Sequence, residues 1–444
     1  MIEQYIAKTI NCSCGRVHSS RVETIEIKEN VIELSLAPFL KEKGYKRLTV
    51  ACDKNTYRVA GERVCAVLKE NAIPFKLHIF AEDTVLPNEH FIGNLTMGMD
   101  LASDLLLAVG SGTINDICRY VSAAAKMPYC IVGTAPSMDG YISGGSALIY
   151  NNLKLTFETH TPTAVFLDPV ILAAAPKDMI SSGVGDLLGK INCLTDWKLS
   201  GLVTAEWHCA FISDIVDAAI EKVTSSNEKI AEGESSAIAD LVEGLLLSGV
   251  CMDFAENSRP ASGCEHHMSH FLEMRYLLEG REAVFHGTKV GIGTVIALRA
   301  YEYVANLDPD FHKIKKLSRP SFEEWEKNIR HAFLGAADEI IDLEKKNAKN
   351  GAERLGARLE ATEKNWSAIK ALAANTASSK SVYDILKRLD APVKPAEIGV
   401  EREMATQAIL YAKEIRDRYT VLQLLWDLGE LDNFTKLIID EYYS

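Results

Sequence analysis

The sequence has no apolar run approaching the roughly 20 residues that a helix needs to cross a bilayer. Its first residues, Met1-Ile-Glu-Gln-Tyr-Ile-Ala-Lys8, also lack the charged region and apolar core of a secretory signal. We therefore expect no membrane span and a cytoplasmic location.

An excess of basic charge is also missing. Lys and Arg total 48 against 61 Asp and Glu, a net charge of −13, and no extended Lys/Arg run could follow a phosphate backbone. We expect no nucleic-acid partner. The length of 444 residues is enough for two packed domains, each with its own core.

The ten cysteines show no spacing typical of a small disulfide framework. Several lie inside apolar segments, which favours reduced, buried thiols: Cys52, Cys130, Cys251 and Cys264.

One cysteine motif differs from the others. Cys12-Ser-Cys14-Gly-Arg-Val-His18 resembles half of a zinc knuckle but supplies only three candidate ligands. We favour a glycine-containing turn here over a second metal, which stays the alternative.

Short apolar segments alternate with helix-like segments through the first third of the chain. Strands that are apolar throughout indicate a parallel sheet covered on both faces, with ligands bound beyond the carboxyl ends of its strands. The predicted strands are 47–53, 76–80, 104–109 and 129–132, and the helices between them include 57–71 and 88–103.

The pattern changes after Ser146. Residues 147–157 contain a polar Asn151-Asn152 turn between two apolar segments, which predicts a β-hairpin. Asp168-Pro169 then marks a boundary, and the periodicity is helical up to Tyr443, including a last long segment 400–428. We predict an α/β domain over 1–168 and an all-helical domain over 169–444.

The charged stretch 336–375 has leucines and Trp366 at helical spacing. This pattern predicts amphipathic helices that pack in the second domain, with binding of a partner helix as the alternative.

Histidines concentrate in Glu265-His-His-Met-Ser-His270. Residues four apart share a helix face, so His266 and His270 are expected to project into one cleft, whereas His267 points about 100° away. With Asp186 upstream and His286 downstream, two imidazoles and a carboxylate can hold a divalent ion and leave a position for a substrate oxygen. On spacing alone, a metal site and ordinary packed histidines are equal alternatives.

A glycine-containing loop, Gly110-Ser-Gly112-Thr-Ile-Asn115-Asp116, follows a predicted strand and opens a helix. Glycines allow a pyrophosphate close to the backbone, and the helix N-terminus supplies unpaired N–H groups. The third glycine of the dinucleotide fingerprint is missing, so a simple strand-to-helix turn remains an alternative. Asp53, at the end of an earlier strand, suits a ribose hydroxyl and disfavours a 2′-phosphate, which favours NAD over NADP.

These motifs occur together in an order that resembles one superfamily, the iron-containing alcohol dehydrogenase and dehydroquinate synthase-like proteins. The resemblance spans nearly the whole chain. Its parts near Thr134–Gly140, Ser258–His266 and Glu414–Thr420 are similar to the bacterial glycerol-1-phosphate dehydrogenase family.

The resemblance implies roles for particular residues. Asp186, His266 and His286 would be the metal ligands, and Asp139, Asp186 and His270 would lie against the substrate, with Asp186 and His270 as the catalytic residues. The dinucleotide would contact Asp53, Gly112, Thr113, Ile114, Asn115, Asp116, Thr134, Ala135, Pro136, Ser137 and Ser143. The cofactor would be NAD(H), with NADP(H) possible, and the metal zinc or nickel, with iron possible.

The implied reaction reduces dihydroxyacetone phosphate, a small phosphorylated three-carbon substrate, to sn-glycerol 1-phosphate for glycerophospholipid metabolism. It would take place at a divalent metal in the cleft between the domains of an expected homodimer. The alternatives are a dehydroquinate synthase-like carbon–oxygen lyase, a glycerol dehydrogenase that acts on an unphosphorylated polyol, and a catalytically silent NAD-binding protein. Arg259 and Lys289, which flank the metal motifs, are candidates for the substrate phosphate.

Overall fold

The computed structural model describes residues 2–151 and 153–443. Residue contacts divide the chain into two compact units. Unit 1 comprises Met1–Leu187 and Ala218–Asn257, and unit 2 comprises Leu188–Asp217 and Ser258–Ser444. Two helices run through the division points, α7 (Lys177–Thr204) and α8 (Ala210–Ser225).

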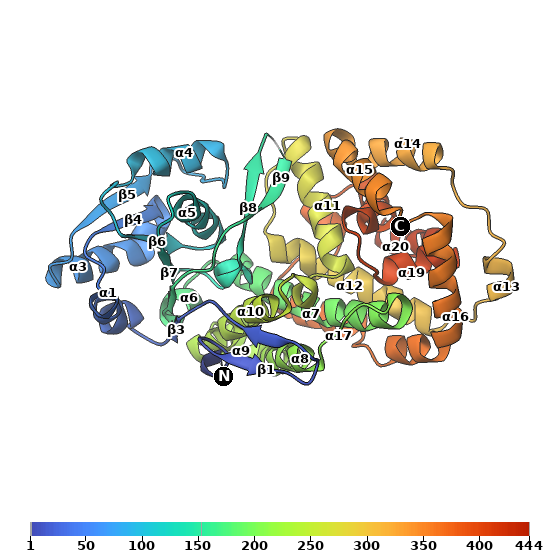
Figure 1. The fold of residues 1–444 in the computed structure, drawn as a ribbon, viewed down its shortest axis with the longest axis horizontal. Helices are drawn as coiled ribbons and strands as arrows, with labels where there is room; N and C mark the ends of the chain where they lie inside the picture. Colours follow the sequence, from blue (N-terminus) through green and yellow to red (C-terminus); the bar gives the residue numbers. More distant parts are fainter. Residues whose placement is uncertain (1, 152, 444) are drawn as a thin grey trace. The chain divides into compact units, whose positions relative to one another are not determined.

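Unit 1 is built on a six-stranded parallel sheet of order β3-β10-β7-β6-β4-β5 (Figure 1). The central strands contain almost only apolar residues, because both faces of the sheet are covered. The strands are β3 (Thr24–Ile27), β4 (Leu48–Asp53), β5 (Phe75–Phe80), β6 (Leu105–Gly110), β7 (Tyr129–Gly133) and β10 (Ala164–Leu167).

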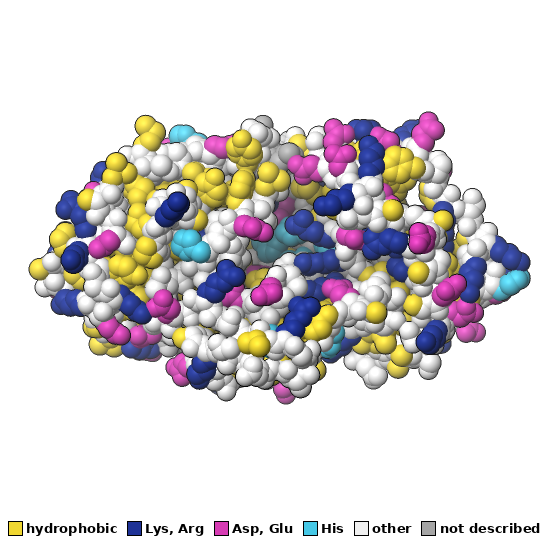
Figure 2. Space-filling view, viewed as in Figure 1, with side chains coloured by type: hydrophobic (Ala, Val, Ile, Leu, Met, Phe, Trp, Pro, Cys, Tyr) yellow, Lys and Arg dark blue, Asp and Glu magenta, His cyan; other side chains and the backbone are white. Residues whose placement is uncertain are grey.

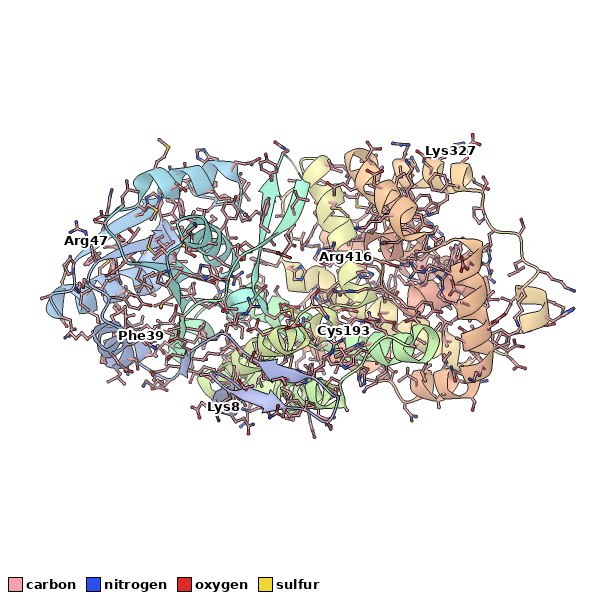
Figure 3. All side chains as sticks on the ribbon, in the orientation of Figure 1. Lys8, Phe39, Arg47, Cys193, Lys327 and Arg416 are labelled. Carbon is pink, nitrogen blue, oxygen red and sulfur yellow. The ribbon has the colours of Figure 1, made fainter. Side chains whose placement is uncertain are left out.

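Alternate residues of each strand face opposite helix layers. Leu105, Leu107 and Val109 of β6 belong to one core with residues of α1 (Ala37–Lys43) and α3 (Glu62–Glu70). Phe39 of α1, labelled in Figure 3, packs edge-on against Phe166 of β10 in this core. The other helices of this region are η2 (Ile32–Leu36), α2 (Lys54–Thr56), η3 (Tyr57–Gly61), α4 (Glu89–Gly98), α5 (Gly112–Ala124) and α6 (Pro169–Ala173).

Two small antiparallel hairpins complete the strands of unit 1. The first pairs β1 (Thr9–Asn11) with β2 (Val17–Ser19), and the second pairs β8 (Gly145–Tyr150) with β9 (Leu153–Glu158). The remaining elements are η1 (Ile2–Gln4), η4 (Gly140–Ile142), α9 (Asn227–Glu232) and the buried α10 (Ser235–Ala255).

The described part of unit 2 consists of helices around an aliphatic and aromatic core that includes Phe271, Tyr301 and Phe333. Its central pair is α11 (Cys264–Leu278) and α12 (His286–Ala305). The others are η5 (Arg259–Ala261), α13 (Phe311–Ile314), α14 (Phe322–Phe333), η6 (Leu334–Ala336), α15 (Ala337–Asn347), α16 (Ala352–Ala374), α17 (Ser379–Arg388), η7 (Pro395–Ile398), α18 (Arg402–Tyr411), η8 (Ala412–Ile415), α19 (Val421–Leu428) and α20 (Leu431–Tyr443).

The parallel sheet, the second hairpin and the change to helices after Asp168 are confirmed. The long helical segment predicted over 400–428 is wrong in detail, because Arg416 to Thr420 form a non-helical break between η8 and α19. The compact units also do not divide at Asp168-Pro169, since α10 belongs with the sheet. Among the described residues, 2–151 and 153–443, no helix combines the length and the hydropathy of a membrane span.

Candidate active site

Three histidine rings gather between α11 and α12 in unit 2. His266 and His270 lie one turn apart on α11, and His286 is the first residue of α12. The ring centroids of His266 and His286 are 5.2 Å apart, and those of His270 and His286 are 5.6 Å apart. The two helices can approach closely because position 293 is glycine, where a Cβ would lie 2.7 Å from the Glu265 carbonyl oxygen.

Each of these histidines directs Nδ1 at a glutamate oxygen. His266 Nδ1 is 2.6 Å from Glu265 Oε1, His270 Nδ1 is 3.1 Å from Glu273 Oε2, and His286 Nδ1 is 2.9 Å from Glu273 Oε1. An ionised carboxylate only accepts hydrogen bonds, so each Nδ1 donates and the neutral imidazole keeps its lone pair on Nε2. A carboxylate behind a histidine in this way is typical of metal-ligating imidazoles.

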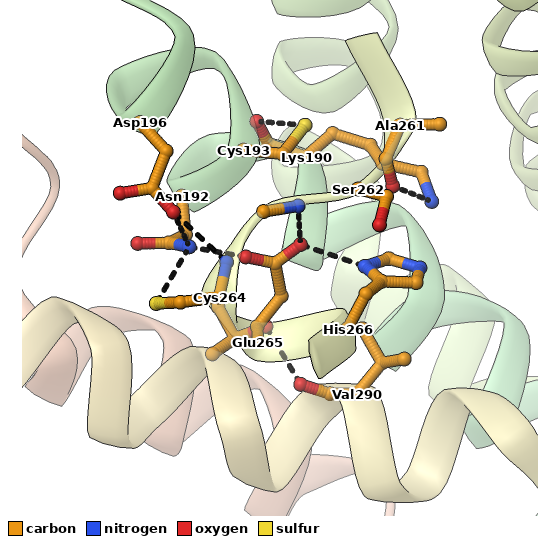
Figure 4. A network of polar contacts seen from close by, with 12 residues as sticks. Lys190, Asn192, Cys193, Asp196, Ala261, Ser262, Cys264, Glu265, His266 and Val290 are labelled. Carbon is orange, nitrogen blue, oxygen red and sulfur yellow. Dashed lines mark hydrogen bonds and ion pairs between the residues drawn. The ribbon is translucent and has the colours of Figure 1, made fainter. Parts of the chain in front are cut away.

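Glu265 is itself held by a buried polar network (Figure 4). Its carboxylate accepts hydrogen bonds from the Gly263 N–H, at 2.7 Å, and from Asn192 Nδ2. Burial alone would raise the pKa of Glu265, but the hydrogen bonds from His266, Gly263 and Asn192 hold that pKa below its ordinary value. Glu265 therefore stays an acceptor, which fixes the orientation of the His266 ring.

His267, in contrast, is completely buried, and neither of its ring nitrogens has a hydrogen-bond partner within the described ranges. Burial and the nearby cations of Arg418 and Lys349 hold the pKa of His267 well below its usual value. The ring is thus a neutral part of the packing of α11.

The two cations expected at a substrate phosphate are engaged inside unit 2. Arg259 is 1 % exposed, donates to the carbonyl oxygens of Asp196 and Tyr419 at 3.1 and 2.8 Å, and pairs with Glu206. Lys289 donates to the carbonyl oxygens of Val284 and Phe285, and its Nζ lies 3.4 Å from Glu273 Oε1.

Arg416 is placed differently. It is exposed and directly follows η8, which packs along α11, and its side chain is visible in Figure 3. Figure 2 shows Lys and Arg side chains gathered over this part of unit 2. Arg416 therefore offers a solvent-accessible cation next to the element that packs on α11.

In unit 1, Asp186 is fully buried on α7. Its Oδ2 accepts a hydrogen bond from the Asp139 N–H at 2.9 Å, and Asp139 Oδ2 accepts one from the Ser248 hydroxyl at 2.9 Å. One turn earlier on α7, Gly183 lies so close to the loop before Asp139 that a Cβ there would be 1.8 Å from the Pro136 carbonyl oxygen. The unit thus holds the 134–139 loop directly against α7.

The predicted dinucleotide loop lies between β6 and α5. Gly110 ends the strand, Ser111 is the N-cap, and α5 begins at Gly112. Thr113 and Ile114 form the first turn of α5, and the buried Thr134, Ala135 and Ser137 follow the neighbouring strand β7. Ser143 follows η4, where its hydroxyl donates to the Gly145 carbonyl at 3.2 Å.

Asn115 and Asp116 make hydrogen bonds within unit 1 that stabilise this region. Asn115 Nδ2 donates to the Gly140 carbonyl oxygen at 3.1 Å. The buried Arg119 donates to Asp116, Tyr129 and the Gly145 carbonyl oxygen, at 2.7–2.8 Å. Burial raises the pKa of Asp116 to about 6 in spite of Arg119.

Asp53 ends β4 and caps the helix that follows. Its Oδ1 accepts hydrogen bonds from the N–H groups of Asn55 and Thr56, each at 2.8 Å, and its own N–H donates to the Thr56 hydroxyl. The side chain therefore has a structural role whether or not it meets a ribose.

Unit 1 contains the predicted dinucleotide residues, Asp139 and Asp186, and unit 2 contains the three histidines. The residues that sequence reasoning missed are Glu265, Glu273 and Arg119. Glu273 had a signal, because it lies three residues after His270 and so shares its helix face. Its pairing with His286 had none, since that requires the packing of α11 on α12.

The sequence is similar to that of known enzymes over most of its length. A model of the iron-containing alcohol dehydrogenase family matches residues 26–176. A glycerol-1-phosphate dehydrogenase (NAD(P)+) of Bacillus licheniformis is 32% identical over 431 residues, which cover 96% of this chain and 95% of that protein. The protein of the same name from Bacillus subtilis is 35% identical over 291 residues, 65% of this chain and 74% of the relative.

Solved structures show the same fold at low identity. A glycerol dehydrogenase from Schizosaccharomyces pombe superimposes with a TM-score of 0.58 at 13% identity. The superposition covers 95% of this chain and 92% of the dehydrogenase chain. A sulfoacetaldehyde reductase from Bifidobacterium kashiwanohense, solved with NAD+, has a TM-score of 0.62 at 12% identity, with coverage of 95% and 98%. The chain belongs to the glycerol-1-phosphate dehydrogenase family.

Proposed function

We propose that the protein reduces dihydroxyacetone phosphate to sn-glycerol 1-phosphate, reversibly, with NADH or NADPH and a divalent metal ion. Two lines support this reaction: the relatives named above and the arrangement of His266, His270 and His286. The observation that carries the proposal is that all three imidazoles have Nδ1 on a glutamate, which fixes the neutral tautomer with its lone pair on Nε2, the form in which an imidazole binds a metal.

We propose Asp186, His266 and His286 as the metal ligands. The geometry of α7 supports Asp186, because it lies one turn before Gly189, where a Cβ would be 3.4 Å from Glu265 Cγ. Residues three apart share a helix face, so the Asp186 carboxylate points toward the same side as Gly189. One carboxylate and two imidazoles, with no thiolate, suit zinc or nickel, and iron as well.

A divalent ion held there would polarise the substrate carbonyl and stabilise negative charge on its oxygen. The reduction adds a hydride from NADH to the carbonyl carbon and a proton to the carbonyl oxygen. We assign the proton to His270. Its side chain is 33% exposed, so Nε2 can take up a proton from solvent and pass it to the carbonyl oxygen while Nδ1 keeps its hydrogen bond to Glu273. Glu273 thereby orients both His270 and His286, while Asp139 and Asp186 line the substrate.

The dinucleotide is proposed to bind over the carboxyl ends of β6 and β7. The backbone from Gly112 to Asp116 faces its pyrophosphate, because the first N–H groups of α5 have no partner within the helix. The 134–137 loop and Ser143 line the same edge of the sheet, and Asp53 meets the ribose. A carboxylate at the ribose supports NADH as the preferred form.

For the substrate phosphate we propose Arg416, because its cation is exposed while those of Arg259 and Lys289 are engaged with carbonyl oxygens and carboxylates. A phosphate needs such a cation for affinity and for discrimination against unphosphorylated polyols.

The deciding experiment measures NADH oxidation by metal-reconstituted protein. Dihydroxyacetone phosphate is expected to be reduced far faster than dihydroxyacetone, and the seven-carbon sugar phosphate of the lyase alternative should release no phosphate. Equal rates with and without the substrate phosphate, or phosphate release from the sugar, would contradict the proposal.

None of the ten cysteines forms a disulfide, which supports the proposed cytoplasmic location. The homodimer expected from the sequence stays a prediction, which light scattering can check.

A further inference from the structure

The N-terminal hairpin of unit 1 contains a sharp turn between β1 and β2. The Gly15 N–H donates to the Cys12 carbonyl oxygen at 3.1 Å, and the Cys12 N–H donates to the Arg16 carbonyl oxygen at 3.1 Å. Gly15 has φ +85°, a left-handed conformation that favours glycine. This confirms the glycine-containing turn, and the turn brings both Cys12 and Cys14 back toward His18 on β2.

Three potential metal donors converge as a result. The Sγ atoms of Cys12 and Cys14 and a ring nitrogen of His18 lie within 4.8 Å of one another. Cys14 Sγ is 3.4 Å from His18 Nε2. In a tetrahedral zinc site, the usual bond lengths place a thiolate sulfur and an imidazole nitrogen about 3.6 Å apart. The observed separation is close to that distance.

The His18 ring is held in the orientation that a ligand needs. It is fully buried, and its Nδ1 lies 2.9 Å from the Phe254 carbonyl oxygen. Since a carbonyl only accepts, Nδ1 donates, and the neutral ring keeps its lone pair on Nε2, toward the thiols. The ring also stacks on the Phe254 side chain, with centroids 5.6 Å apart.

We propose that Cys12, Cys14 and His18 hold a zinc ion, with a fourth ligand from outside the hairpin. Thiolate and imidazole donors together favour zinc over harder divalent ions. The hairpin is small and packs on the end of α10, where Asp253 accepts hydrogen bonds from Ser20 and Arg21. A metal on these side chains would hold the hairpin turn to β2, and His18 in turn contacts the Phe254 carbonyl oxygen at the end of α10, so we infer a structural site.

This site differs chemically from the proposed active site, because the ligand set Asp186, His266 and His286 contains no sulfur. Cobalt distinguishes the two, since a thiolate on Co²⁺ produces a charge-transfer absorption in the near ultraviolet that carboxylate and imidazole ligands do not.

The experiment loads metal-free, full-length protein with Co²⁺ and records its spectrum. We expect the thiolate band in the unaltered protein and in His266→Ala, but not in Cys12→Ser or Cys14→Ser. Cys65→Ser, which changes a buried thiol of α3, is the matched control and should keep the band. Elemental analysis after zinc loading should give one equivalent less in the two hairpin variants than in the control.

Cys14→Ser reconstituted with metal should still oxidise NADH, because the hairpin residues are not part of the active site, but it should unfold at a lower temperature. A spectrum of the unaltered protein without the thiolate band would overturn the zinc site, as would an unchanged zinc content in Cys14→Ser. A Cys12–Cys14 disulfide found by mass spectrometry of freshly purified, unreduced protein would also overturn it.

Discussion

The three clustered histidines have the same tautomer for the same reason, a glutamate oxygen at Nδ1, yet they are assigned different tasks. His266 is 5 % exposed and His286 begins a helix, positions suited to fixed ligands, whereas His270 is the more exposed ring of α11. Substitution at single residues can separate a ligand from a proton donor, because only a ligand determines metal content.

We expect His266→Ala to abolish tight metal binding together with turnover. His270→Ala should keep the metal and the dinucleotide while kcat falls by ~10²–10⁴, the usual contribution of a positioned proton donor. His267→Ala removes a packed ring and should leave the metal content unchanged. Elemental analysis and steady-state rates of the three purified variants provide the measurement. Loss of the metal from His267→Ala but not from His266→Ala would contradict the assignment.

Asp53 should be tested by Asp53→Asn rather than by a smaller residue. The amide oxygen can still cap α2, so the fold is retained while the negative charge is removed. Without that charge, a 2′-phosphate is repelled less, and the ratio of kcat/KM for NADPH to kcat/KM for NADH should rise. If this ratio does not change, Asp53 does not meet the ribose.

Arg416→Ala should raise the KM for dihydroxyacetone phosphate by ~10-fold or more, because a charge-assisted contact to phosphate contributes about 1.5–3 kcal/mol. The rate with unphosphorylated dihydroxyacetone should be unaffected. Lys327→Ala, at an exposed position of α14 labelled in Figure 3, is the control for loss of a positive charge. Equal effects of the two substitutions would exclude Arg416 as the phosphate ligand.

At the scale of elements, the packing of α7 against the 134–137 loop requires a residue without a side chain at position 183. Gly183→Ala would place a Cβ 1.8 Å from the Pro136 carbonyl oxygen, so the helix or the loop must move. We expect a loss of about 1–3 kcal/mol in the free energy of unfolding and weaker NADH binding.

Gly93→Ala is the matched control for Gly183→Ala. Gly93 lies inside α4, and a Cβ there meets nothing within 4 Å. Alanine should therefore stabilise this helix by about 0.5–1 kcal/mol. Denaturant unfolding of both variants, with NADH titration, checks the pair. The expectation fails if Gly183→Ala is as stable as the unaltered protein.

The elements themselves were predictable to different degrees. Central strands such as β6 could be predicted because they are apolar throughout and precede glycine loops. β3 and β10 were not predicted as strands, because four residues carry little pattern and their pairing joins Thr24 with Ala164. Within the candidate site, the helical spacing predicted the shared face of His266 and His270. It could not predict that Glu273 contacts His286, which depends on how α11 and α12 pack.

At the scale of the whole molecule, activity should depend on a bound metal. Protein stripped with a chelator should lose NADH oxidation and regain it with zinc, nickel or another borderline divalent ion, since the proposed active-site ligands are nitrogen and oxygen. Rates measured beside elemental analysis test this. Full activity in a preparation shown to contain no metal would refute the metal-dependent mechanism.

The position of α10 in the sequence affects how unit 1 can fold while the chain is being synthesised. Strand β3 pairs with β10, which lies 140 residues later in the chain. Unit 1 is completed by α10 only after residues 188–217 of unit 2 have been synthesised. Native pairing between such distant segments is slow to form, and unit 1 leaves the apolar surface that packs on α10 exposed until α10 has been made. No single cut in the chain separates the two units, so neither can be expressed alone as one uninterrupted fragment.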